Sequence, residues 1–168
     1  MKKIIISIVI AFICIAANAQ KNIIKTNPFG LAFGNINLIY ERLLNNHSSI
    51  LVKGQYGYNL LGTSVNLFGC GVDYRYYFTY AKKAVPSGFY INPEIMFQGG
   101  MMDLQDDKNG LYRLGLGAEI GYQWVWDSGF TLDLGIGPMY NLIKTDSGNF
   151  EKLDFLIPAG TLGIGFAF

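Results

Sequence analysis

The residues from Gly110 to Trp126 read GLYRLGLGAEIGYQWVW, and this stretch decides the fold class. Its alternate residues form two faces of opposite chemistry. One face is continuously apolar and aromatic, with Tyr112, Leu114, Leu116, Ala118, Ile120, Tyr122, Trp124 and Trp126. The other mixes glycines with charged and polar side chains, with Leu111, Arg113, Gly115, Gly117, Glu119, Gly121, Gln123 and Val125. Because a period of two residues is typical of a β-strand, the stretch predicts a strand with one apolar and one polar face.

Similar alternating segments recur along the chain, separated by polar or Gly-containing turns. They predict eight strands, approximately at residues 23–33, 36–44, 49–58, 67–80, 88–101, 111–126, 130–144 and 153–168. Each segment reaches the roughly nine to eleven residues that a tilted strand needs to cross a bilayer. The turn at Asp127 to Gly129 is short, whereas residues 102–110 and 145–152 are expected to form longer loops at the other end. No linker or low-complexity block divides the chain, so the strands are expected to form one domain.

Two barrels fit this alternation. In a soluble, lipocalin-like barrel the apolar face would point inward, and the interior would have to hold the Tyr, Trp and Phe of every strand. An eight-stranded interior is only just filled by ordinary side chains or one small ligand, so the volumes disagree. Turning the barrel inside out removes the conflict, because the bulky residues then face lipid and the glycines relieve crowding inside. The predicted fold class is therefore an all-β, eight-stranded antiparallel up-and-down transmembrane β-barrel.

The chain begins MKKIIISIVIAFICIAANAQ, which has the basic head, short apolar run and small-x-small triplet of a cleavable secretory signal peptide. We expect cleavage after Ala19, giving a signal peptide at residues 1–19 and a barrel domain at residues 20–168. A retained membrane helix is the rival interpretation, but the apolar run is short for a span. Export of a barrel predicts the outer membrane of a Gram-negative bacterium, with the periplasm as the alternative location.

Net charge argues against nucleic-acid binding, and cysteine content argues against a disulfide. Without the two lysines of residues 1–19, 11 of the 13 Lys and Arg remain against 12 Asp and Glu, so the net charge is close to zero. Nucleic-acid-binding domains are typically basic, so this charge argues against nucleic-acid binding. Cys70 is the one cysteine outside residues 1–19, so no disulfide within the barrel is expected. Cys70 is interpreted as a small hydrophobic side chain on the oily face.

Charges of both signs fall on the face assigned to the lumen. Burying them singly would cost several kcal/mol each, so a mutually paired network is expected. The candidate network residues are Lys25, Glu41, Lys53, Asp73, Arg75, Glu94, Arg113, Glu119 and Asp133.

Aromatic residues gather near the ends of the predicted strands, where membrane barrels carry girdles. The girdle at the periplasmic end is expected to contain Tyr40, Tyr80, Phe89, Trp124, Trp126, Phe130 and Phe168, and the outer girdle Tyr58, Phe68, Tyr112 and Tyr140. The chain ends TLGIGFAF, and Phe166 with the terminal Phe168 resembles the signal that the barrel assembly machinery of the outer membrane reads.

By this pattern the chain outside residues 1–19 resembles the small OmpA/OmpX-type outer-membrane barrels. The opening IKTNPFGLAFGNINLIYERLL is more specifically similar to an uncharacterised family of small Gram-negative barrels. The residues that carry this likeness are Lys25, Thr26, Asn27, Asn37, Tyr40, Glu41 and Arg42. The resemblance implies location and fold, and it implies no activity.

Signals for chemistry are weak. His47, the one histidine, lies beside Ser48 and Ser49 and faintly resembles a lipid-deacylase element, but the topology places it away from an outer-leaflet substrate. An acidic loop with Asp103, Asp106, Asp107 and Asn109 lacks the stricter spacing of cation-binding loops.

The sequence predicts no catalytic residue, metal or cofactor. We expect a non-enzymatic outer-membrane protein with a structural or surface-contact role and a side-chain-filled lumen. Its expected partners are outer-membrane lipid, lipopolysaccharide and, during biogenesis, the barrel assembly machinery, with no ligand identified. A lipid-modifying barrel enzyme and a soluble periplasmic ligand binder are the alternatives.

Overall fold

The computed structural model describes residues 21–32, 34–60, 63–79, 87–104, 107–145 and 155–168. The predicted signal peptide, Tyr80 of the predicted girdle and most of the loop at residues 145–152 lie outside the described residues. Within the described ranges, no helix has the length and hydropathy needed to span a membrane.

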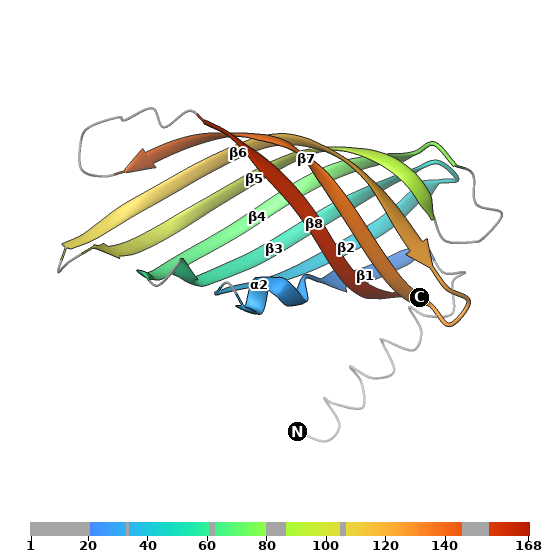
Figure 1. The fold of residues 1–168 in the computed structure, drawn as a ribbon, viewed down its shortest axis with the longest axis horizontal. Helices are drawn as coiled ribbons and strands as arrows, with labels where there is room; N and C mark the ends of the chain where they lie inside the picture. The colour runs from blue at the N-terminus through green and yellow to red at the C-terminus, as the bar shows by residue number, and fades with distance from the viewer. Residues whose placement is uncertain (1–20, 33, 61–62, 80–86, 105–106, 146–154) are drawn as a thin grey trace, which may run out of the picture.

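Eight antiparallel strands close into a barrel in which each strand pairs with its neighbours in the sequence (Figure 1). The strands are β1 (Asn22–Thr26), β2 (Asn35–Asn45), β3 (Ser48–Leu60), β4 (Thr63–Tyr77), β5 (Gly88–Leu104), β6 (Asp107–Val125), β7 (Phe130–Thr145) and β8 (Phe155–Ala167). Pairing of β1 with β8 closes the barrel. The prediction of an all-β barrel with eight antiparallel strands is confirmed.

The two ends of the barrel differ. We call the end that holds the start of β1, the carboxy terminus and the turns at Asn46–His47 and Asp127–Gly129 the proximal end (Figure 1). The opposite end, with the tips of the β3–β4 and β5–β6 hairpins, is the distal end. Strands β5 and β6 are the longest, with 17 and 19 residues, so the wall is tallest there.

The first predicted strand is wrong beyond Thr26. Strand β1 stops there, and a short helix α2 follows at Pro28–Ala32. Pro28 has no backbone N–H to donate to a strand ladder. The side-chain oxygen of Asn27 accepts hydrogen bonds from the backbone N–H groups of Phe29 (3.0 Å) and Gly30 (3.3 Å), which turns the chain away from the extended conformation.

The distal β5–β6 connection is also shorter than predicted. Pairing runs without a register shift from Gly88↔Gln123 to Leu104↔Asp107, so β5 and β6 include most of the residues that were assigned to a loop. Only residues 105 and 106 separate the two strands. Continued pairing satisfies the backbone N–H and C=O groups of this segment, which a loop would leave to solvent.

The apolar residues face outward and the polar residues face inward. Leu116 and Leu134 are 44 % and 40 % exposed on the outer surface, whereas Glu119 and Asp133 are 2 % and 0 % exposed. The buried apolar side chains include a small cluster of Ile23, Val125 and Ala167 at the proximal end. The interior of this barrel is therefore chiefly polar, the reverse of a soluble protein core.

Candidate functional site: the polar lumen

A buried cluster of four charged side chains crosses the proximal half of the lumen. Lys25 Nζ from β1 lies 2.7 Å from Glu41 Oε2 on β2 and 2.6 Å from Asp133 Oδ2 on β7. Arg75 Nη1 from β4 lies 2.8 Å from the same Asp133 oxygen and 3.7 Å from Glu41 Oε2. All four side chains are fully buried, and their formal charges cancel. We call them the proximal network.

Neutral side chains complete the hydrogen bonding of the proximal network. Glu41 Oε1 accepts from Ser49 (2.5 Å) and Tyr77 (2.6 Å). Tyr90 donates its hydroxyl to Asp133 Oδ1 (2.7 Å), and the Arg75 guanidinium lies 3.7 Å from the centre of the Tyr90 ring. Buried charges are tolerated when such bonds replace lost hydration.

Gln123 links the cations of the proximal network. Its side-chain oxygen accepts from both Lys25 (2.8 Å) and Arg75 (3.1 Å), while its amide nitrogen donates to Tyr77 (3.0 Å). The proximal network lies on β1, β2, β4 and β7, and its neutral partners Ser49, Tyr90 and Gln123 add contacts from β3, β5 and β6.

Two inward-facing glycines make room for Tyr90. A Cβ at Gly135 would lie 2.6 Å from the Tyr90 hydroxyl oxygen, and a Cβ at Gly121 would clash with the same atom. Glycine on the inner face therefore has the packing role that the sequence predicted.

A second cluster surrounds Lys53 near the middle of the lumen. Lys53 Nζ lies 2.6 Å from Asp73 Oδ2 and 2.7 Å from Glu94 Oε2. Asn92 donates to the same Asp73 oxygen at 3.0 Å. One cation thus faces two carboxylates, and Glu94 Oε1 has no hydrogen-bond partner among the described atoms.

Glu119 and Arg113 stand apart from these ion pairs. Glu119 Oε2 accepts a hydrogen bond from Thr161 (2.7 Å), and no cation of the described residues lies within 4.0 Å of it. Arg113 lies further toward the distal end, where it donates to Asn141 (2.6 Å) and contacts the Met139 sulfur. The structure thus brings seven of the nine candidate network residues into ion pairs and leaves these two outside them.

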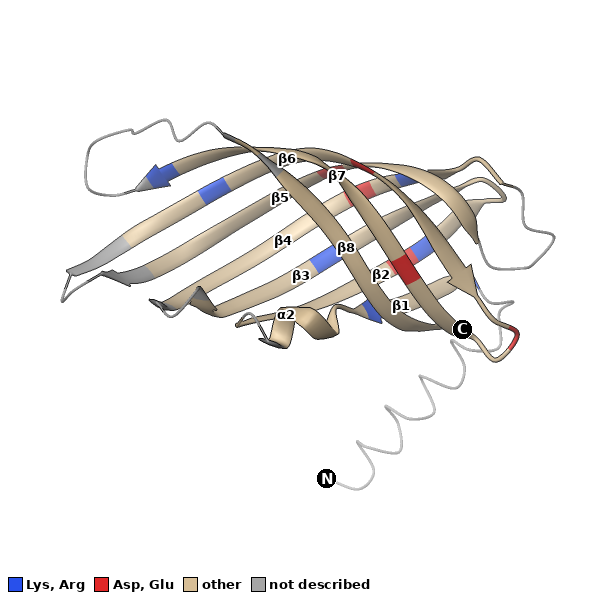
Figure 2. Ribbon diagram, in the orientation of Figure 1, with Lys and Arg blue, Asp and Glu red and all other residues tan. Residues whose placement is uncertain are grey.

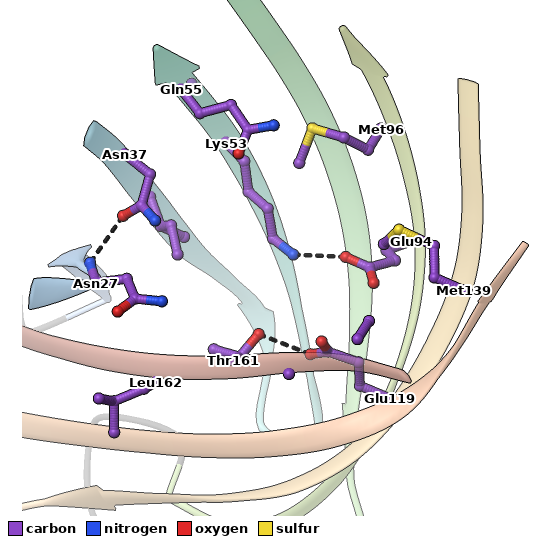
Figure 3. Close-up of a pocket in the computed structure, with 14 residues that line it drawn as sticks. Asn27, Asn37, Lys53, Gln55, Glu94, Met96, Glu119, Met139, Thr161 and Leu162 are labelled. Atoms are coloured by element: carbon purple, nitrogen blue, oxygen red, sulfur yellow. Dashed lines mark hydrogen bonds and ion pairs between the residues drawn. The ribbon is translucent and has the colours of Figure 1, made fainter. Parts of the chain in front are cut away.

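A cavity of about 140 Å³ lies between the Lys53 cluster and Glu119. Figure 3 shows Lys53 reaching Glu94, Thr161 reaching Glu119, and Asn27 bonded to Asn37 on another side of the cavity. Met96, Met139 and Gln55 complete much of its lining. The charged residues of the wall strands are marked in Figure 2.

The sequence did not identify Tyr77, Tyr90, Gln123, Ser49, Asn92 or Thr161 as members of the lumen clusters. A signal existed for several of them. Tyr77 lies two residues after Arg75 and Tyr90 lies four residues before Glu94, so both share the inward face of their strands. Tyr77 and Tyr90 were not predicted there because bulky side chains were expected to face outward.

Most described aromatic residues of the predicted proximal girdle lie on the outer surface near the proximal end. Phe89, Trp124, Trp126 and Phe130 are exposed, and Trp126 and Phe130 pack with ring centroids 5.3 Å apart beside the turn. Tyr40 and Phe168 are half-buried. Tyr58, Phe68, Tyr112 and Tyr140, assigned to the outer girdle, are also exposed, as is Phe166 of the predicted assembly signal.

His47, the residue considered for catalysis, lies at the proximal turn and away from the lumen cavity, whereas the side chains of the acidic loop considered for metal binding lie outside the described residues. The His47 ring stacks on Tyr76, and its Nδ1 lies 3.3 Å from the Tyr77 carbonyl oxygen at the proximal turn. The described residues contain no group of three or more His, Cys, Asp or Glu placed to hold a metal ion. Cys70 is exposed on the outer face.

Comparison with known proteins gives one match. Residues 4–157 match the model of a family described as a protein of unknown function, DUF3575. No curated protein and no solved structure matches the chain.

Proposed function

This chain belongs to the DUF3575 family, whose description gives no activity, and from its barrel we propose that it is an integral outer-membrane protein. In this proposal the barrel spans the bilayer as a non-enzymatic component of the envelope, with a structural or surface-contact role. Side chains fill its lumen, and the likeness to OmpA/OmpX-type barrels belongs to the same proposal.

The observation that carries the proposal is the inverted distribution of polarity. Large apolar side chains cover the outside along the strands, including Ile120 and Ile136, which are each 63 % exposed. Exposing so much contiguous apolar surface to water is unfavourable by roughly 25 cal/mol per Å². A hydrocarbon environment removes this cost, and it leaves the fully buried ions of the lumen in the polar interior of the barrel.

The hydrogen-bonded wall supports the same environment. Every strand pairs with two neighbours, so most backbone N–H and C=O groups bond within the wall. A closed barrel and a helix are the two structures that satisfy the backbone inside hydrocarbon. The predicted signal peptide and the predicted assembly signal at Phe166 and Phe168 favour export and assembly in the outer membrane, where lipid and lipopolysaccharide would be the permanent partners.

Spin labels test the orientation of the wall directly. With Cys70 replaced by serine, labels are attached at L116C and L134C on the outer face and at T131C, whose parent side chain is fully buried, on the inner face. In reconstituted vesicles we measure the relaxation of each spin label by two agents, oxygen, which concentrates in lipid, and a water-soluble nickel complex. We expect the two outer labels to be relaxed more by oxygen than by the nickel complex. A protein that stays in the aqueous fraction without detergent, with outer labels exposed to the nickel complex, would overturn the proposal.

A further inference from the structure

The barrel wall is incomplete beside β1. Strand β1 pairs with β2 only as far as Lys25↔Ile39 and with β8 only as far as Thr26↔Ile164. Both neighbours continue toward the distal end, β2 to Asn35 and β8 to Phe155, and no strand of the described residues lies between them. We call this interval the side gap.

Helix α2 covers part of the side gap. It lies beside β2 (Figure 1) and contacts both β2 and β8. A Cβ on its Gly30 would lie 2.7 Å from the Asn35 carbonyl oxygen of β2. Five residues of helix rise about 7.5 Å, less than the five extended residues that would continue β1. The helix therefore replaces only some of the missing wall.

The lumen cavity lies directly behind the side gap. Its lining includes residues from both rims, Asn27 and Asn37 on one side and residues 159–162 of β8 on the other. Gly160 belongs to this lining, is exposed, and shares the alternation of the exposed, outward-facing Ile164 and Phe166 of β8. The cavity thus borders a residue of the outward face of the wall at the side gap.

Acidic side chains outnumber basic ones among the described residues around the cavity. Lys53 is shared between Asp73 and Glu94, and Glu119 has no cationic partner among the described residues. Glu94 is 7 % exposed, lines the cavity and has a carboxylate oxygen without a hydrogen-bond partner among the described atoms. A buried carboxylate is costly unless a cation or donors satisfy it.

The outer rim of the side gap is apolar. Phe29 and Leu31 of α2 are 61 % and 54 % exposed, and Leu38 of β2 and Leu156 of β8 are 55 % and 69 % exposed. A ligand that reaches the cavity from this side first contacts the apolar rim and then the acidic side chains of the cavity. That order of environments matches an amphiphile with a cationic head.

We propose that the cavity binds the primary ammonium group of a membrane-lipid headgroup, which reaches it from the bilayer through the side gap. This inference rests on the proposed membrane location. An ammonium group offers three hydrogen-bond donors. Glu94, Glu119 and the side-chain oxygen of Gln55 supply acceptors around the cavity. A volume of about 140 Å³ admits part of a headgroup, so the acyl chains stay outside against the apolar rim.

The test compares two lipids that differ in their donors. Protein is reconstituted in vesicles with equal phosphatidylethanolamine and phosphatidylcholine of the same acyl chains, and the lipid retained after mild detergent extraction is quantified. Phosphatidylcholine has a quaternary ammonium group without N–H donors. We expect several-fold enrichment of phosphatidylethanolamine on the wild-type protein. Equal retention of the two lipids would overturn the inference.

Two variants locate the site. Glu119→Gln removes one carboxylate from the cavity. Because the loss of a charged hydrogen bond weakens binding about tenfold, we expect the several-fold enrichment to fall to the lipid ratio of the bulk vesicles. Asp127→Asn, at the exposed proximal turn, is the matched control and should keep the enrichment. Enrichment unchanged in Glu119→Gln would also overturn the inference.

Gly160→Trp tests the route and leaves both carboxylates in place. A Cβ at Gly160 would meet only the Gly135 carbonyl oxygen, at 3.5 Å, so a side chain fits there and obstructs the side gap. We expect loss of the enrichment, and retained enrichment would contradict lateral access. In a parallel arm free ethanolamine is added at the same concentration as the lipid. Displacement of the lipid by it would favour a water-soluble amine and overturn the lipid assignment.

Heat-modifiable gel migration of each sample reports insertion independently of lipid binding. A wild-type protein that does not insert contradicts the proposed function itself. One that inserts without lipid selectivity contradicts only this inference. If Glu119→Gln does not insert, the wild-type lipid comparison and Gly160→Trp decide the outcome.

Discussion

At the scale of single residues, Asp133 has the most demanding position in the lumen. It accepts hydrogen bonds from Lys25, Arg75 and Tyr90 while fully buried. Asp133→Ala would leave two buried cations with Glu41 as their one ion-pair partner in the proximal network. We expect it to lower the free energy of unfolding by about 3–5 kcal/mol, measured by urea unfolding of the refolded barrel.

The control for Asp133→Ala is Asp127→Asn, which changes an exposed carboxylate at the proximal turn. Surface substitutions of this kind usually alter stability by about 0.5 kcal/mol or less. Equal unfolding midpoints for the two variants would contradict the importance of the proximal network.

The inner glycines give a second prediction at this scale. Gly135→Ala would place a methyl carbon 2.6 Å from the Tyr90 hydroxyl oxygen, whereas a Cβ at Gly54 meets nothing within 4 Å. We expect Gly135→Ala to destabilise the barrel by about 1–3 kcal/mol through overpacking and Gly54→Ala to have little effect. Thermal unfolding of both variants measures the difference, and similar stability of the two would show that Tyr90 moves aside without cost.

His47 gives a third prediction. Its ring packs on Tyr76 at the proximal turn, outside the lumen clusters. If the protein is non-enzymatic, His47→Ala leaves the lipid A of the producing cells unchanged, as judged by mass spectrometry of extracted lipid. Loss of a lipid A modification in that variant, with the barrel still inserted, would favour the alternative of a lipid-modifying enzyme.

Sequence alternation predicts the inward face of most charged residues, because the side-chain period of a strand is fixed at two. Arg75 and Glu119 follow this rule. It does not predict partners, since Lys25 meets Asp133 across 108 positions in the chain. Which charges pair depends on how all the strands are staggered, and that stagger is not local information.

At the scale of elements, helix α2 is the largest departure from the predicted strands. The residues after Asn27 read PFGLAF, and their apolar character continues the preceding strand pattern. The local signal against a strand was Asn27 followed by Pro28, a pair that favours a turn. Alternation outweighed that signal in the prediction, although a proline in a strand should have limited it.

Asn27 is the residue whose loss should loosen α2. Asn27→Ala removes the side-chain oxygen that accepts from Phe29 and Gly30, while the backbone carbonyl oxygen of residue 27 still accepts from Gly30. We expect about 1 kcal/mol of local destabilisation and faster hydrogen exchange of those two amides. The turn from Trp126 to Gly129 serves as the internal control, because its hydrogen bonds do not involve Asn27. Unchanged protection of the α2 amides would contradict the capping role.

At the scale of the whole molecule, the number of strands, their antiparallel order and the outward apolar face were predictable. Segments such as Gly110 to Trp126 carry that information in their own alternation. The side gap was not predictable, because it depends on β1 ending at Thr26 while β8 extends to Phe155 on the opposite side of the closure. The cavity behind it follows from the same non-local geometry.

The closed lumen leads to the last prediction. The proximal network ties β1 and β2 to β4 and β7 across the bore, with Arg75 and Asp133 fully buried between them. An eight-stranded barrel leaves no wide channel once such side chains fill it. We therefore expect the wild-type protein to show no discrete conductance steps in planar bilayers. The double variant Arg75→Ala with Asp133→Ala removes one charge of each sign and much of the packed volume, and we expect it to conduct small ions. Conductance of the wild-type protein equal to that of the double variant would mean that the proximal network does not close the bore.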